Sequence, residues 1–235
     1  MEDLDEAITC HRQALALRPH GHPSRSASLN NLAIAVSTRF NQLGGMEDLE
    51  EAITCHRQAL ALRPHGHPNR SYSFHSLACD VTTRFEQLGR MEDLEEAITC
   101  HCQALALRPH GHPDRSYSLS GVANVVSIRF RQSRSNDDLL DAVKYYSEAK
   151  NILPTGHPRQ SAAGSNLASI LLIQCDIVSK SDESLCMMTK AFELFEHAVN
   201  HSTASAKDRF YAAVTWATEA HRRDLHLLCM LIPSH

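Results

Sequence analysis

The sequence has 235 residues, a net charge of −4 at pH 7, 43% hydrophobic residues and 21% charged residues, a balance typical of a folded protein rather than a disordered one. Lysine and arginine form no basic stripe, and no apolar run approaches the roughly 20 residues that span a bilayer, so we expect neither nucleic acid nor a membrane as a partner. The N-terminus, MEDLDEA, lacks the features of a signal peptide, which predicts an intracellular, cytoplasmic protein.

One repeated segment organises the chain. The sequence MEDLEEAITCHRQALALRPHGHP begins at Met46 and recurs with few substitutions at Met1 and Met91, and a weaker copy begins at Asn136, so the period is 45 residues. A fixed period of this length is typical of a solenoid, in which each unit buries its apolar face against its neighbours. The sequence therefore predicts an all-α solenoid of antiparallel helix pairs.

We expect the repeat array to cover residues 1–222. A first helix over 2–18 is followed by repeats over about 24–64, 69–109, 114–154 and 159–200, and by a final helix over 206–222. Residues 223–235 form an apolar tail that is either a cap or a truncated end. The first helix lacks a partner before it, so Leu4, Ile8 and Leu15 are expected to be partly uncovered. The chain is then either a fragment of a longer array or a protein with a frayed first helix.

Each repeat combines two amphipathic helices. After Met46, Asp48 and Glu51 have capping-box spacing, and the helix they open ends near Gly66, which lies between two prolines. Its buried stripe is predicted to consist of Leu49, Ala52, Ile53, His56, Ala59 and Leu60. The other helix, from about Asn69 to Leu88, has apolar positions at i, i+3, i+4, i+7 and i+11 that recur in each unit. Those positions are Leu29/Phe74/Leu119, Leu32/Leu77/Val122, Ala33/Ala78/Ala123, Val36/Val81/Val126 and Phe40/Phe85/Phe130.

Recurrent histidine, cysteine and arginine residues are interpreted as structural. A His-Gly-His turn such as His65 to His67 offers only two of the four ligands of a closed zinc site, so turn formation is the favoured role. Adjacent helical residues such as Cys10 and His11, or Cys55 and His56, point about 100° apart and do not converge as nucleophile and base, which favours core packing. The series Arg39/Arg84/Arg129 is expected to pair with acidic residues at the start of the following helix. No catalytic, cofactor-binding or metal-binding residue is predicted.

The spacing of Ala52, His56, Ala59 and Pro64 recurs in each unit and resembles the second-helix signature of tetratricopeptide repeats. The 45-residue unit is longer than the usual 34 and resembles the kinesin-light-chain-like subclass. The repeated wording is similar to tandem arrays in fungal proteins that precede a caspase-like CHAT domain or accompany signalling NTPases. The resemblance implies a right-handed superhelix of helix pairs that binds a protein or peptide on its concave face.

In tetratricopeptide proteins the variable positions of the first helix of each pair face that groove. By this resemblance the partner-binding residues are Asn30, Ile34, Thr38, Tyr72, His75, Cys79, Thr83, Tyr117, Ser120, Asn124, Ile128, Ser165, Ser169, Leu172 and Ile173. Tyr72 and Tyr117 are the expected anchors, because aromatic side chains supply much contact energy at little entropic cost. Lysine is absent from the set, so acidic C-terminal tails are not expected as ligands. Sequence drift of unconstrained positions is the alternative explanation of their variability.

These observations favour a non-enzymatic scaffold that holds a protein segment, of unknown identity, in the groove and needs no cofactor. The alternative is a structural or regulatory spacer within a larger signalling protein of the CHAT-domain or NTPase type, with no free ligand of its own. A hydrolase or metal protein built on the cysteines and histidines is the least favoured reading.

Overall fold

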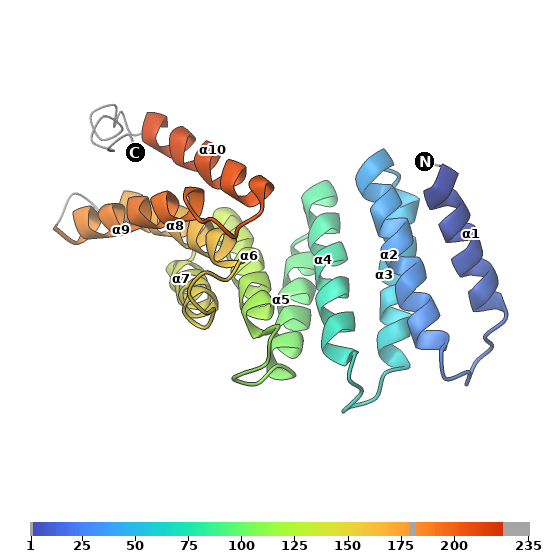
Figure 1. Cartoon of the computed structure of the whole chain (residues 1–235). Coiled ribbons are helices and arrows are strands. Elements are labelled where there is room, and N and C mark those ends of the chain that lie inside the picture. The colour runs from blue at the N-terminus through green and yellow to red at the C-terminus, as the bar shows by residue number, and fades with distance from the viewer. Residues whose placement is uncertain (1, 179–181, 223–235) are drawn as a thin grey trace. The chain divides into compact units, whose positions relative to one another are not determined.

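The computed structural model describes residues 2–178 and 182–222, and over these residues the chain forms ten α-helices and no strand (Figure 1). The helices are α1 (Glu2–Ala16), α2 (Arg25–Leu43), α3 (Met46–Ala61), α4 (Arg70–Leu88), α5 (Met91–Ala106), α6 (Arg115–Ser133), α7 (Asn136–Asn151), α8 (Gln160–Ile177), α9 (Asp182–Val199) and α10 (Ala206–Arg222). The prediction of an all-α solenoid is confirmed. None of the helices within these ranges combines the length and apolarity that crossing a bilayer requires.

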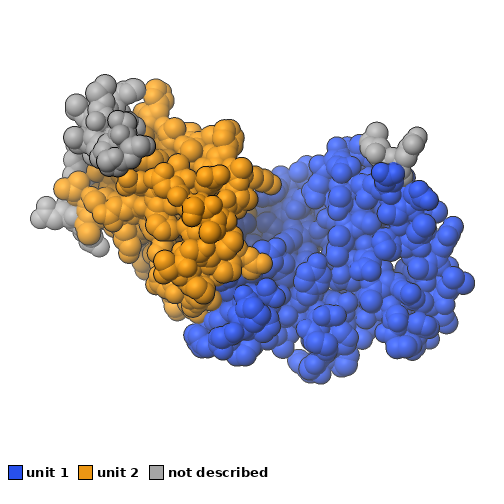
Figure 2. Space-filling model, in the orientation of Figure 1, with its two compact units in different colours: residues 1–125 blue, residues 126–235 orange. Residues whose placement is uncertain are grey.

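The helices gather into two compact units, residues 1–125 and 126–235 (Figure 2). In the first unit neighbouring helices pack in sequence, α1 on α2, α2 on α3, α3 on α4 and α4 on α5. In the second unit α8 packs against α7, α9 and α10. Each helix therefore buries its apolar face mainly against helices that are close in sequence, as a repeat array requires. The assignment of residues 1–222 to one array remains a prediction, and the tail predicted over 223–235 lies outside the described residues.

The recurrent apolar positions form the core. Leu32, Ala33 and Val36 of α2 are at most 2% exposed, and their counterparts in α4 are at most 3% exposed. Each large aliphatic side chain buried in this way contributes roughly 1.5–3 kcal/mol of transfer free energy. Phe74 is the exception, because it is only half-buried and carries the Arg70 guanidinium 5.1 Å from its ring centre.

The His-Gly-His turns have the structural role that was predicted. Gly66 has a left-handed φ of +86°, which residues with a Cβ rarely adopt. The Nδ1 atom of His67 accepts a hydrogen bond from the backbone N–H of Asn69 at 3.1 Å. The counterparts His22, His112 and His157 make the same bond to the residue two positions later. This bond explains why the fourth copy, which has Thr155 in place of the first histidine, keeps the second one.

The arginine series joins consecutive helices, as predicted. Arg39 Nε and Nη2 donate to the two carboxylate oxygens of Asp48 at 2.8 and 2.6 Å. Arg84 binds Asp93 in the same way at 3.1 and 2.7 Å. The Arg39 guanidinium holds the pKa of Asp48 below its usual range. The predicted capping box is wrong, because the Asp48 carboxylate is occupied by Arg39 and α3 starts without any side-chain cap after Gly45.

Two expectations for α1 need correction. Ile8 is only 1% exposed, because it packs into the cluster formed by α2 and α3, whereas Leu4 and Leu15 are partly buried as expected. Cys10 is exposed, although its counterparts Cys55 and Cys100 are buried. The side of α1 that carries Cys10 faces solvent, so the thiol at this repeat position is buried in the later copies alone.

Candidate functional site

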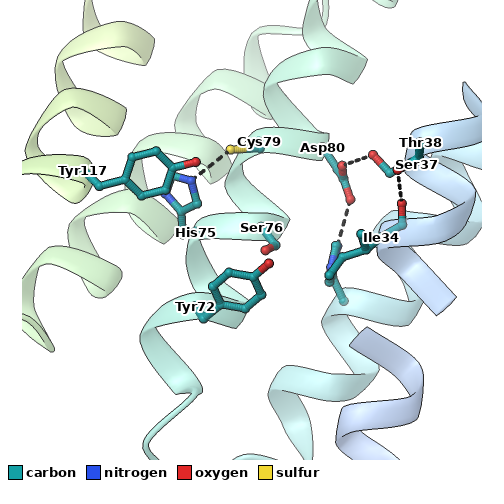
Figure 3. Close-up of a pocket in the computed structure, with 10 residues that line it drawn as sticks. Ile34, Ser37, Thr38, Tyr72, His75, Ser76, Cys79, Asp80 and Tyr117 are labelled. Carbon is teal, nitrogen blue, oxygen red and sulfur yellow. Dashed lines mark hydrogen bonds and ion pairs between the residues drawn. The ribbon is translucent and has the colours of Figure 1, made fainter. Parts of the chain in front are cut away.

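A pocket of about 190 Å³ opens on the first unit between α2, α4 and the start of α6 (Figure 3). Its lining is formed by Ile34, Ser37 and Thr38 of α2, by Tyr72, His75, Ser76, Cys79 and Asp80 of α4, by Tyr117 of α6 and by His56 of α3. On α4 most of these residues follow helical spacing, i, i+3, i+4 and i+7, so they share one face. That face is turned away from the Leu77-Ala78 core stripe, which leaves it available to the pocket.

Three apolar or aromatic side chains surround the pocket. Tyr72 and Tyr117 are each 44% exposed, and Ile34 is 38% exposed. The Tyr117 ring packs on His75 with 4.2 Å between ring centres and 41° between the planes. This contact limits the orientation of the Tyr117 ring.

A polar network closes one side of the pocket. The Asp80 carboxylate accepts a hydrogen bond from Ser37 Oγ at 2.8 Å and lies 2.8 Å from His56 Nδ1, which donates to it. Both members of the pair are buried, with His56 2% and Asp80 6% exposed. A buried carboxylate is tolerated only when it is paired and hydrogen-bonded in this way. His56 Nε2 is buried without a hydrogen-bond partner in the described part of the chain.

A second cluster lies beside this network and joins α4 to α5. Cys79 Sγ is 3.4 Å from His75 Nε2, and the ring centres of His75 and His101 are 5.0 Å apart. Burial, together with the nearby Arg108 guanidinium, lowers the pKa of His75 to about 4. Burial and the His75 ring lower the pKa of His101 to about 3, so both imidazoles are neutral at pH 7.

The Cys79 thiol is not an activated nucleophile. Protein atoms packed around the sulfur, with the Asp80 carboxylate next to it, raise its pKa to about 12. The residue still has part of its surface open to solvent, and it lines the pocket. A thiol with so high a pKa is protonated at pH 7, whereas catalytic cysteines have lowered pKa values. The geometry at Cys79 is therefore not that of a nucleophile paired with a base.

The structure brings part of the predicted groove together. Ile34, Thr38, Tyr72, His75, Cys79 and Tyr117 line the pocket. Thr83, Ser120 and Asn124 are at least partly exposed and lie outside it, and Ile128, Ser169 and Ile173 are partly exposed in the second unit.

Four predicted groove residues are buried, contrary to the expected exposure. Asn30 is 4%, His75 5%, Ser165 2% and Leu172 0% exposed. Asn30 lies 3.4 Å from the Arg63 guanidinium, which reaches back from the turn after α3. This contact covers the Asn30 side chain.

Sequence reasoning missed the polar pair that closes the pocket. Asp80 stands where the other copies have Ala35, Val125 and Ile170. A single acidic residue at an otherwise apolar repeat position was the signal that could have identified it. His56, which was predicted to be a core residue, is indeed buried, but it also reaches the pocket through its contact with Asp80.

Helix pairs that stack at a fixed period define the chain as an α-solenoid repeat protein. Residues 25–69 match the family model described as tetratricopeptide repeat, in agreement with the motifs of the repeat. No curated protein matches the chain.

Solved structures with a similar fold include arrays of TPR-like repeats. Two of them contain nearly identical TPR-like repeats of a proposed kinesin light chain from Podosopora anserina. One, a variant, has a TM-score of 0.60 and 22% identity over 83% of this chain and 84% of that chain. The other has a TM-score of 0.60 and 21% identity over 85% of this chain and 90% of that chain. At these identities the similarity shows the fold, which is the fold that the resemblance to kinesin-light-chain-like repeats implied.

Proposed function

We propose that the chain is a non-enzymatic protein-interaction scaffold that binds a segment of another protein in the pocket between α2, α4 and α6. The observation that carries this proposal is the contrast between the two faces of the same helices. The core position occupied by Ala78 is alanine in all four copies, whereas the pocket position occupied by Cys79 is isoleucine, cysteine, asparagine or serine. Packing fixes one face, and the other is free to specialise for a ligand.

The pocket fits an anchor side chain better than a cofactor. Its volume of about 190 Å³ is below the roughly 300–1,000 Å³ of sites for drug-sized molecules. The Asp80 charge is already paired with His56, and no lysine lines the pocket. We therefore expect a neutral segment with an apolar or aromatic anchor that packs between Tyr72 and Tyr117. Hydrogen-bonding groups beside the anchor would meet the hydroxyls of Thr38 and Ser76.

A cytoplasmic location is part of this proposal. The seven cysteines in the described part of the chain are all free thiols, two of them buried in repeated core positions. Free cysteines in this number are typical of proteins that stay in a reducing compartment. We expect the partner to be a protein of the same compartment, and neither nucleic acid nor a membrane.

The test is a peptide-display selection against the full chain, with affinities of the selected peptides measured by fluorescence polarisation. The Tyr72→Ala/Tyr117→Ala double variant introduces the residue found at the equivalent positions Ala27 and Ala162, so the helices should be unaffected. Loss of a hot-spot aromatic costs about 2 kcal/mol or more, which corresponds to at least about thirtyfold weaker binding. Tyr211→Ala, an exposed tyrosine on α10 outside the pocket, is the matched control and should bind normally.

The opposite result would favour the spacer hypothesis. Selected peptides that bind the double variant as tightly as the wild type, or a selection without enrichment, would contradict binding in this pocket. The array would then be a structural or regulatory segment of a larger protein, of the CHAT-domain or NTPase type that its sequence resembles.

A further inference from the structure

Three potential metal ligands converge between α4 and α5 of the first unit. His75 and Cys79 lie one helical turn apart on α4, and His101 comes from α5, which packs against it. One ligand atom from each residue lies within 4.8 Å of the other two. We propose that His75, Cys79 and His101 form a zinc-binding site.

The separations are close to those around a bound ion. Zinc–nitrogen distances of about 2.0–2.1 Å and a zinc–sulfur distance of about 2.3 Å, at tetrahedral angles, place neighbouring ligand atoms about 3.3–3.6 Å apart. Cys79 Sγ and His75 Nε2 are already 3.4 Å apart, as the dashed line in Figure 3 marks. The third ligand atom, at 4.8 Å or less, needs a shift of at most about 1.5 Å, which rotation of the His101 side chain can supply.

The two imidazoles are incompletely satisfied by the protein. His75 is 5% and His101 2% exposed, and in both rings Nδ1 is buried without a hydrogen-bond partner among the described residues. Buried polar atoms in native proteins nearly always have a partner, so the unpaired Nδ1 of His101 calls for a further bound group. His75 would bind the ion through Nε2, the atom that lies 3.4 Å from Cys79 Sγ. A metal ion is the ligand that neutral imidazole binds most commonly.

The repeat departs from its own pattern at this point. The position of Gly121 on α6 is Asn31, Ser76 and Asn166 in the other copies. A Cβ at Gly121 would lie 2.7 Å from Cε1 and Nδ1 of the His101 ring, so the glycine makes room for that ring. His75 replaces Asn or Ser, and Cys79 replaces Ile, Asn or Ser, at the equivalent positions. Residues that depart from the repeat on α4 (His75 and Cys79) and on α6 (Gly121) therefore lie around the proposed metal site.

The three ligand atoms of the site indicate which metal it would bind. Two nitrogens and one sulfur favour zinc over magnesium or calcium, which prefer oxygen ligands. On binding, the Cys79 thiol releases its proton to solvent and the thiolate coordinates the ion. Three protein ligands leave a fourth position, as in open zinc sites. Because His75 and Cys79 line the pocket, that position would face it.

The test is a cobalt titration of the full chain, freed of metal under reducing conditions, followed by displacement with zinc. We expect one tetrahedral cobalt per chain with a thiolate-to-cobalt charge-transfer band, and loss of that band when zinc is added. Cys79→Ser should abolish the band. His101→Tyr, which introduces the residue of the fourth copy, should weaken binding by at least the about 10–100-fold seen when an outer partner of a metal ligand is removed.

Cys10→Ser is the matched control. Cys10 is an exposed cysteine at a recurrent position of the repeat, and His11 follows it directly. This variant should leave the band and the affinity unchanged. Circular dichroism should show that all three variants retain the helical content of the wild type. Cobalt bound without a thiolate band, as exposed turn histidines would bind it, would overturn the proposal. The same conclusion would follow if the band persisted in Cys79→Ser.

Discussion

Acidification from pH 7 to pH 5 should destabilise the first unit through His75 and His101. Burial lowers the pKa of His75 to about 4 and that of His101 to about 3, whereas an unfolded histidine has a pKa of about 6.5. As the pH falls below about 6.5, the unfolded chain binds protons that the folded chain does not. The stability that these two residues contribute is therefore complete above that pH and is lost progressively towards pH 4 and 3.

The size of the effect follows from the two pKa differences. A pH of 5 lies about 1.5 units below the pKa of an unfolded histidine. Protonation therefore stabilises the unfolded chain by about 2 kcal/mol for each histidine, at 1.36 kcal/mol per unit. The two together reduce the free energy of unfolding by about 4 kcal/mol, a large part of the roughly 5–15 kcal/mol of a typical domain. Arg108 opposes protonation of His75 and Asp114 favours it, and the Tyr117 ring packs on His75.

Urea unfolding at pH 7, 6 and 5, followed by circular dichroism with a chelator present, measures this dependence. The wild type is compared with a His75→Asn/His101→Tyr variant. The two new residues are those that other copies of the repeat have at the equivalent positions, Asn30 and Tyr146. The Asp48 pKa is lowered, so its contribution is lost only below about pH 4, outside the range tested. Parallel pH profiles for the wild type and the variant would refute the assignment of the effect to the two histidines.

Two further predictions concern the scaffold. Arg84→Ala leaves the Asp93 carboxylate, 3% exposed, without its bidentate partner and should cost about 3–5 kcal/mol in urea unfolding, whereas Arg12→Ala, at an exposed ion pair, should cost less than about 1 kcal/mol. Equal losses would show that burial does not determine the strength of these pairs. Gly66→Ala should cost about 1–2 kcal/mol, because its φ of +86° is strained for alanine although a Cβ there meets no atom within 4 Å. Gly45→Ala, without a positive φ, should cost less than Gly66→Ala, and a reversed order would contradict the conformational argument.

The fold was largely predictable because the same buried positions recur in several copies of the repeat. The apolar positions of Leu32, Ala33 and Val36 keep their spacing in each copy. This recurrence distinguishes apolar residues of the core from apolar residues that occur by chance. Burial at the groove was less predictable. Asn30 follows the pocket spacing, yet it is covered by Arg63, which comes from the turn after another helix. Contacts of this kind depend on how one helix pair lies on the next, which the period does not specify.

The distribution of the departures favours specialisation over drift. Drift would scatter substitutions over unconstrained positions that do not contact one another. In α4 two of the departures, His75 and Cys79, contact each other instead, and the third, Asp80, is held by Ser37 and by His56. A carboxylate buried at a position that is apolar in every other copy costs desolvation free energy and adds no packing. The proposed function accounts for this paired Asp80 through a ligand that the pocket binds, whereas selection for stability alone would favour an apolar residue at this position.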